Sequence, residues 1–138
     1  MFLIHLEDTS PVSAVGDPTN PAYSPIYIEL DSTDVQPPPS EWIRCYVSLP
    51  AGYISLKNEA GTAGGALIKF EGTTAGMWQI TTDNPSIVPT PTTSAEIRVS
   101  VLNNTPSSFW IRGRTTYGEI PVDDRSAALR VSGQVEEV

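Results

Sequence analysis

The side chains able to carry acid–base or nucleophilic chemistry are few in this 138-residue chain. His5 is the only histidine, so a Ser-His-Asp arrangement would have to be built on it. His5 lies near a chain end, where backbone frays unless it is tied down, whereas catalytic geometry needs rigid support. We therefore expect no such triad, and we expect the protein not to be an enzyme.

The carboxylates fall into small local groups. Glu29, Asp31 and Asp34 are close in sequence, and Asp123 and Asp124 are adjacent. Calcium takes six to eight oxygen ligands, but neither group has the spacing of an EF-hand loop, so both are interpreted as acidic turn residues. A carboxylate pair for glycoside hydrolysis is defined by a spatial separation, which the sequence leaves open, and a small hydrolase is the least favoured hypothesis.

Neither cysteine chemistry nor phosphate binding is indicated. Cys45 is the only cysteine, so an internal disulfide and a cysteine-based zinc site are excluded, and we expect a buried, inert thiol. The glycine-rich segment 61–66 lacks the lysine and the following helix of a phosphate loop, so it is interpreted as a hairpin tip. We expect no cofactor and no metal. The single cysteine favours an intracellular protein, or a virion protein assembled in the host cytoplasm.

The net charge of −8 is concentrated in the N-terminal third. Residues 1–43 contain seven acidic residues and no basic one, whereas residues 44–138 contain nine acidic and eight basic residues. Such a chain is a poor candidate for nucleic-acid binding, which needs a clustered cationic surface. The apolar run at the start ends at Leu6, too short for a signal peptide, and no segment approaches the ~20 apolar residues of a membrane span.

From Trp42 onward the hydrophobic pattern has a period of two, which is typical of half-buried antiparallel strands. Short strands are separated by turn signals rich in Gly, Pro, Asn and Asp, and no segment keeps a helical period. The side chains expected to point inward are Ile43, Cys45, Val47, Leu49, Ile54, Leu56, Ala66, Ile68, Phe70, Trp78, Ile80, Ala95, Ile97, Val99, Val101, Phe109, Ile111, Ala127, Leu129 and Val131. The pattern predicts an all-β antiparallel sandwich over residues 42–138.

Residues 1–41 differ from the rest because they combine acidic residues with many prolines, including the triplet 37–39. Proline removes a ladder donor and favours extended backbone. Residues 2–6 and 26–30 nevertheless alternate as strands do. We therefore expect an extended N-terminal arm that contains one or two strands, and the sequence leaves open whether residues 2–6 pair with the chain's own sheet or with a neighbour's.

Two rows of aromatic and basic residues are expected to face away from the core. Trp110, Arg112 and Arg114 share one face of a predicted strand. The second row consists of Trp42, Arg44 and Tyr46. A tryptophan beside arginines suits a sugar-stacking platform or a protein-binding hot spot. Alternatively, the two rows pair with each other across strands or lie under the acidic arm.

The strand-rich part of the chain, about residues 42–133, resembles an immunoglobulin-like sandwich, with Trp78 or Trp42 in the place of the buried core tryptophan. Together with the acidic, proline-rich arm, it resembles small virion proteins of tailed bacteriophages, of the capsid decoration or cement type. That resemblance implies a structural protein on the outer capsid surface, bound to major capsid protein subunits as a dimer or trimer.

The resemblance also implies partner contacts, for which we expect the arm to supply apolar anchors and the sandwich a basic, aromatic row. The residues expected to bind partners are Phe2, Ile4, Tyr23, Ile26, Trp110, Arg112 and Arg114. One alternative is a tail, neck or baseplate component. Another is a carbohydrate-binding module with Trp110 and Tyr46 as stacking platforms.

Overall fold

The computed structural model describes residues 2–6, 30, 32–33, 35–118 and 127–138. These residues form nine strands and one short 3-10 helix. The elements are β1 (Leu3–Leu6), β2 (Ile43–Ser48), β3 (Tyr53–Lys57), β4 (Ala66–Glu71), η2 (Ala75–Met77), β5 (Trp78–Thr81), β6 (Glu96–Val99), β7 (Ser107–Gly113), β8 (Ala128–Ser132) and β9 (Gln134–Glu137). In the described residues no helix is long and apolar enough to cross a membrane.

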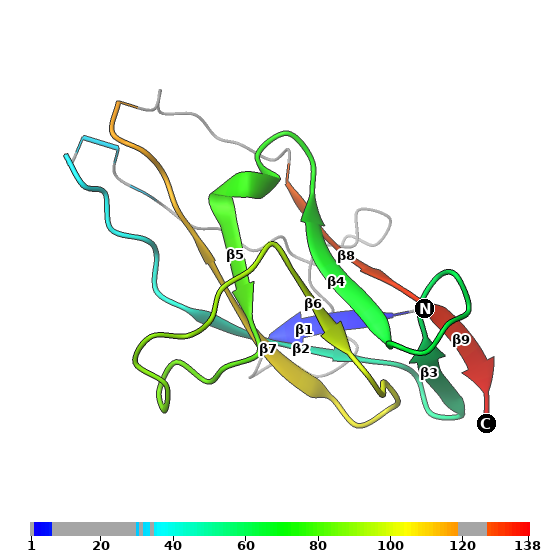
Figure 1. Cartoon of the computed structure of the whole chain (residues 1–138). Helices are drawn as coiled ribbons and strands as arrows, with labels where there is room; N and C mark the ends of the chain where they lie inside the picture. The colour runs from blue at the N-terminus through cyan, green and yellow to red at the C-terminus, as the bar shows by residue number, and fades with distance from the viewer. Residues whose placement is uncertain (1, 7–29, 31, 34, 119–126) are drawn as a thin grey trace.

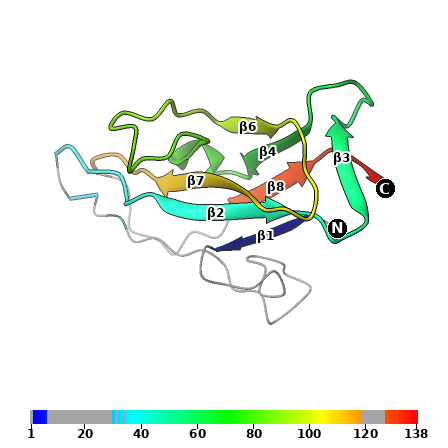
Figure 2. The same ribbon diagram turned by 90° about the horizontal axis from the view of Figure 1, so that it is seen from below.

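The strands form an antiparallel sandwich. A four-stranded sheet has the order β1-β2-β7-β5, a three-stranded sheet has the order β6-β4-β8, and β3 pairs with β9. Figures 1 and 2 show the four-stranded and three-stranded sheets facing each other, with β3 and β9 at one end. The predicted all-β antiparallel sandwich is confirmed.

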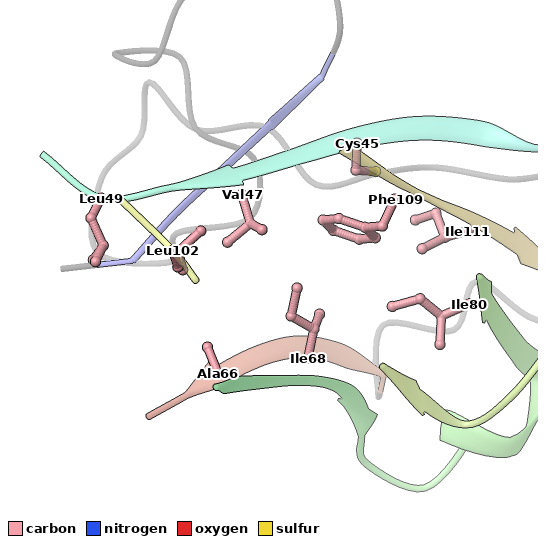
Figure 3. Close-up of a cluster of buried hydrophobic side chains, with 9 residues drawn as sticks. All are labelled: Cys45, Val47, Leu49, Ala66, Ile68, Ile80, Leu102, Phe109 and Ile111. Carbon is pink, nitrogen blue, oxygen red and sulfur yellow. The ribbon is translucent and has the colours of Figure 1, made fainter. Parts of the chain in front are cut away.

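The core lies between the two larger sheets (Figure 3). Cys45 and Val47 of β2 and Phe109 and Ile111 of β7 point from one sheet toward Ile68 of the other. All five are fully buried. The side chains of β2, β4 and β7 that the sequence predicts to point inward therefore do face the core. In β2 and β7 the inward side chains stand directly opposite each other in the antiparallel register.

Three predicted inward positions are wrong: Ala95, Leu56 and Val101. Ala95 is exposed and lies just before β6, which begins at Glu96. Leu56 is 43% exposed, whereas the neighbouring Ser55 is fully buried and forms an isolated bridge with Leu102. Val101 is 51% exposed because β6 ends at Val99, and the chain then turns so that Leu102 enters the core. At Leu56 and Val101 the strand is irregular or has ended where the alternation fails, so a period of two no longer assigns the face.

The N-terminal strand pairs with the chain's own sheet. In β1, Ile4 lies opposite Val47 and Leu6 lies opposite Cys45 of β2. Phe2, Ile4 and Leu6 are partly buried and pack against the core. The strand predicted for residues 2–6 is therefore present as an edge strand of the four-stranded sheet, and its apolar side extends the core of the sandwich.

Cys45 is buried as predicted, and its reactivity can be tested directly. Burial raises the pKa of the Cys45 thiol to about 12. Because the thiolate is the reactive form, we expect Ellman's reagent to modify the native protein at neutral pH only as fast as the protein unfolds. The same chain in denaturant, where the thiol is accessible, is the control and should react at once.

The same shift has a consequence for stability. The folded pKa lies above the ordinary value of 9.0, so the unfolded chain loses the thiol proton first as the pH rises. The contribution of Cys45 is therefore complete below pH 9 and is lost as the pH rises toward about 12. Rapid labelling of the native protein at neutral pH would contradict this account.

Candidate interaction surface

The outer face of the four-stranded sheet holds the aromatic and basic rows predicted from the sequence. Arg44 of β2 lies directly opposite Trp110 of β7, which in turn lies opposite Thr81 of β5. These three side chains alternate with core positions on their strands, so they face away from the core. The two predicted rows therefore meet across paired strands on one face of the sheet.

Arg44 sits between two aromatic rings. Its guanidinium carbon is 5.1 Å from the ring centroid of Tyr46 and 5.4 Å from that of Trp110. Both distances lie in the range of cation–π attraction. The predicted exposure of Trp110 is wrong: the residue is only 8% exposed. It faces outward from a central strand, with Arg44 and Thr81 opposite it on the two neighbouring strands.

Arg112 is held on two sides. Its guanidinium carbon lies 4.3 Å from the ring centroid of Trp42, and its Nε donates a hydrogen bond of 2.7 Å to Oε1 of Gln79 on β5. Gln79 in turn donates from Nε2 to Oγ1 of Thr93 at 3.5 Å. The guanidinium is therefore stacked on Trp42, just before β2, and oriented by Gln79 on β5, which leaves its other N–H groups to point away from Gln79.

Arg114 is exposed and follows directly after β7. Its backbone N–H donates to the carbonyl of Met77 at 2.7 Å. Burial of Arg112, and then repulsion from Arg114, lower the pKa of Arg112 below its ordinary value. Arginine stays charged at neutral pH despite such a shift, so the two residues place two positive charges beside each other.

Three other basic residues of the described chain, Lys57, Lys69 and Arg130, are paired with carboxylates. Lys57 lies 3.7 Å from Glu136, and Lys69 lies 3.6 Å from Glu71. Arg130 contacts Glu71 at 3.4 Å. Among the described residues no carboxylate lies within 4 Å of the guanidinium of Arg112 or Arg114, so these two cations differ from Lys57, Lys69 and Arg130.

The structure brings only some of the predicted partner-binding residues to this surface. Arg112 and Arg114 lie on it, and Trp110 lies within it as a buried member. Phe2 and Ile4 pack instead against the core of their own sandwich. Tyr23 and Ile26, and the strand predicted for residues 26–30 up to residue 29, lie outside the described residues.

Gln79 and Thr93 were not predicted. Both are ordinary polar residues in their local sequence, and their part in holding Arg112 depends on β5 lying beside β7, which no local pattern reveals. We name the set Trp42, Arg44, Tyr46, Gln79, Trp110, Arg112 and Arg114 the cation–aromatic face.

The described residues hold no group of three or more His, Cys, Asp or Glu side chains that could bind a metal ion. The cation–aromatic face offers stacking surfaces and guanidinium donors, which is chemistry suited to binding a carboxylate-bearing or aromatic partner. No family model, no curated protein and no solved structure matches this chain.

Proposed function

We propose that this protein is a non-enzymatic structural component of a virion, a capsid decoration protein that binds the outer surface of major capsid subunits and stabilises the head. The observation that carries the proposal is the cation–aromatic face. Protein-binding surfaces are enriched in Trp, Tyr and Arg, and these are the side chains gathered here. Their position on β2 and β7 gives them the rigid support of paired strands.

The charge of the chain also supports this setting. A net charge of −8 suits the exterior of a capsid better than its nucleic-acid-facing interior, where phosphates would repel it. A protein of this size gains its effect by avidity, because weak contacts are multiplied over many copies on a lattice. We expect it to act as a dimer or trimer.

The carbohydrate-binding alternative loses its main support. A sugar stacks on an accessible aromatic ring, and Trp110 is only 8% exposed. Tyr46 remains partly exposed, but its neighbour Arg44 lies 5.1 Å from the centre of its ring. No observation on this face therefore favours a sugar over a protein partner.

The test is to add the purified protein to expanded heads assembled without it. We expect it to cosediment with heads and to raise the temperature at which they release their contents. The variant R112Q should bind more weakly than R98Q, because Arg98 is an exposed arginine of β6 on the other sheet. Heads that are fully resistant without the protein would refute the proposal, and cosedimentation with tails alone would favour a tail, neck or baseplate role.

A further inference from the structure

Two extended segments leave the sandwich together at one end (Figure 1). We name residues 35–41, which lead into β2, and residues 114–118, which follow β7, the projecting end. Ser40 N–H donates to the carbonyl of Gly113 at 2.9 Å, and Gly113 N–H donates to Oγ of Ser40 at 3.0 Å. Farther out, Gly118 N–H donates to the carbonyl of Ser32 at 3.0 Å. These bonds fix the two segments to each other.

The projecting end exposes apolar side chains. Val35 is 76% exposed and Tyr117 is 64% exposed. Between Val35 and β2, the proline triplet 37–39 restricts the backbone to extended conformations. A surface that is already ordered loses little conformational entropy when a partner binds to it, which favours recognition.

The base of the projecting end is cationic. Arg114 belongs to the projecting end, and Arg112 lies two residues earlier, within β7. Glu41 lies next to Ser40, which bonds to Gly113, yet the described residues place no carboxylate within ion-pair distance of either arginine. Stacking on Trp42 and the bond to Gln79 hold Arg112 in place, which prepares its remaining N–H groups for a carboxylate.

The complementary charge is present in this chain. Residues 1–43 contain seven acidic residues and no basic one, so they form an acidic segment with no internal cation to neutralise it. Among the described carboxylates of residues 44–138, Glu136 is paired with Lys57 and Glu71 is paired with Arg130. Charge complementarity therefore matches the arginines at the projecting end with the first third of the chain.

We propose that the projecting end, with Arg112 and Arg114 at its base, is a self-association surface that binds the acidic segment 7–34 of a second copy of this chain, which precedes the projecting end in the sequence. The inference deepens the proposed function and rests on it for its setting on a capsid lattice, where neighbouring copies would be linked head to tail. The association itself belongs to the isolated protein, so it is measured without capsids.

The experiment is sedimentation velocity of the full chain over a concentration series at low and at high salt. We expect reversible association that weakens at high salt, as screening requires. R114Q should weaken association about threefold, whereas R98Q, which removes the same charge from the opposite sheet, should leave it unchanged. The double variant R112Q/R114Q should weaken association about tenfold. R114Q keeps the test valid if the double variant fails to fold, because the Arg114 side chain is exposed.

A peptide identifies the occupant. A synthetic peptide of residues 27–34 should inhibit association, and the same peptide with its Asp and Glu residues replaced by Asn and Gln should not. A wild-type protein that stays monomeric at every concentration, equal effects of R114Q and R98Q, or equal inhibition by both peptides would each overturn the inference. A monomeric protein that still binds heads would overturn the self-association inference while leaving the proposed function intact. A protein that associates but does not bind heads would overturn the proposed function while leaving the self-association inference intact.

Discussion

Replacing Phe109 with alanine is expected to destabilise the protein by about 3–5 kcal/mol. Phe109 is fully buried and is among the largest of the fully buried side chains. It lies at the centre of β7, directly opposite Cys45 of β2, and points between the two sheets (Figure 3). Removing the ring loses its burial and leaves a cavity, because neighbours held on paired strands cannot collapse into the space.

The measurement is denaturant unfolding followed by tryptophan fluorescence, compared with two controls. F109L keeps an apolar side chain in the core and should cost less than F109A. I87A removes a side chain that is 76% exposed and should change stability by no more than about 0.5 kcal/mol. Typical domain stabilities are about 5–15 kcal/mol, so F109A alone could remove a large part of the total. A loss below about 1 kcal/mol would show that Phe109 is not central to the core.

The core of the sandwich is the part of the fold that the sequence predicts well. In β2 apolar and polar side chains alternate throughout, and in β7 the inward Phe109 and Ile111 stand two residues apart on either side of the outward Trp110. Both strands lie inside the four-stranded sheet with one face on the core. A strand with one face on the core needs an apolar side chain at every second residue, and this need produces the hydrophobic period of two in the sequence. At Leu56 the alternation predicts the wrong face, because β3 pairs with β9 through a register shift.

The candidate surface is predicted less completely, for a physical reason. Alternation places Trp110 on the outer face, but it does not reveal that the side chain is only 8% exposed there. The hydrogen bond between Gln79 and Arg112 depends on β5 pairing with β7, and the two residues are 33 positions apart in the chain. Such contacts are non-local, so residue type and spacing cannot reveal them.

Replacing Gly65 with alanine is expected to cost more than any surface substitution, several kcal/mol by the usual magnitudes of strain and steric overlap. The sequence predicts a hairpin tip at residues 61–66, and Gly65 does lie in the loop before β4. Gly65 is nevertheless buried, against the backbone at the end of β6. A Cβ there would overlap the carbonyl oxygen of Val99 and lie 2.5 Å from Cα of Ser100. Both are backbone atoms at the end of β6, so no side-chain rotation can relieve the overlap.

Gly65 also has a φ of +76°, which an L side chain rarely adopts. The control that separates the two effects is G52A, because Gly52 has a φ of +91° but a Cβ there would meet nothing within 4 Å. We expect G52A to cost about 1–2 kcal/mol from backbone strain alone and G65A to cost clearly more. The excess should come from disturbed pairing of β4 with β6, where Ala66 lies opposite Val99. Thermal unfolding measures the total, and amide hydrogen exchange at Ala66–Lys69 locates it. Equal costs for the two variants would show that β6 yields freely, which would contradict the close packing of the three-stranded sheet against this loop.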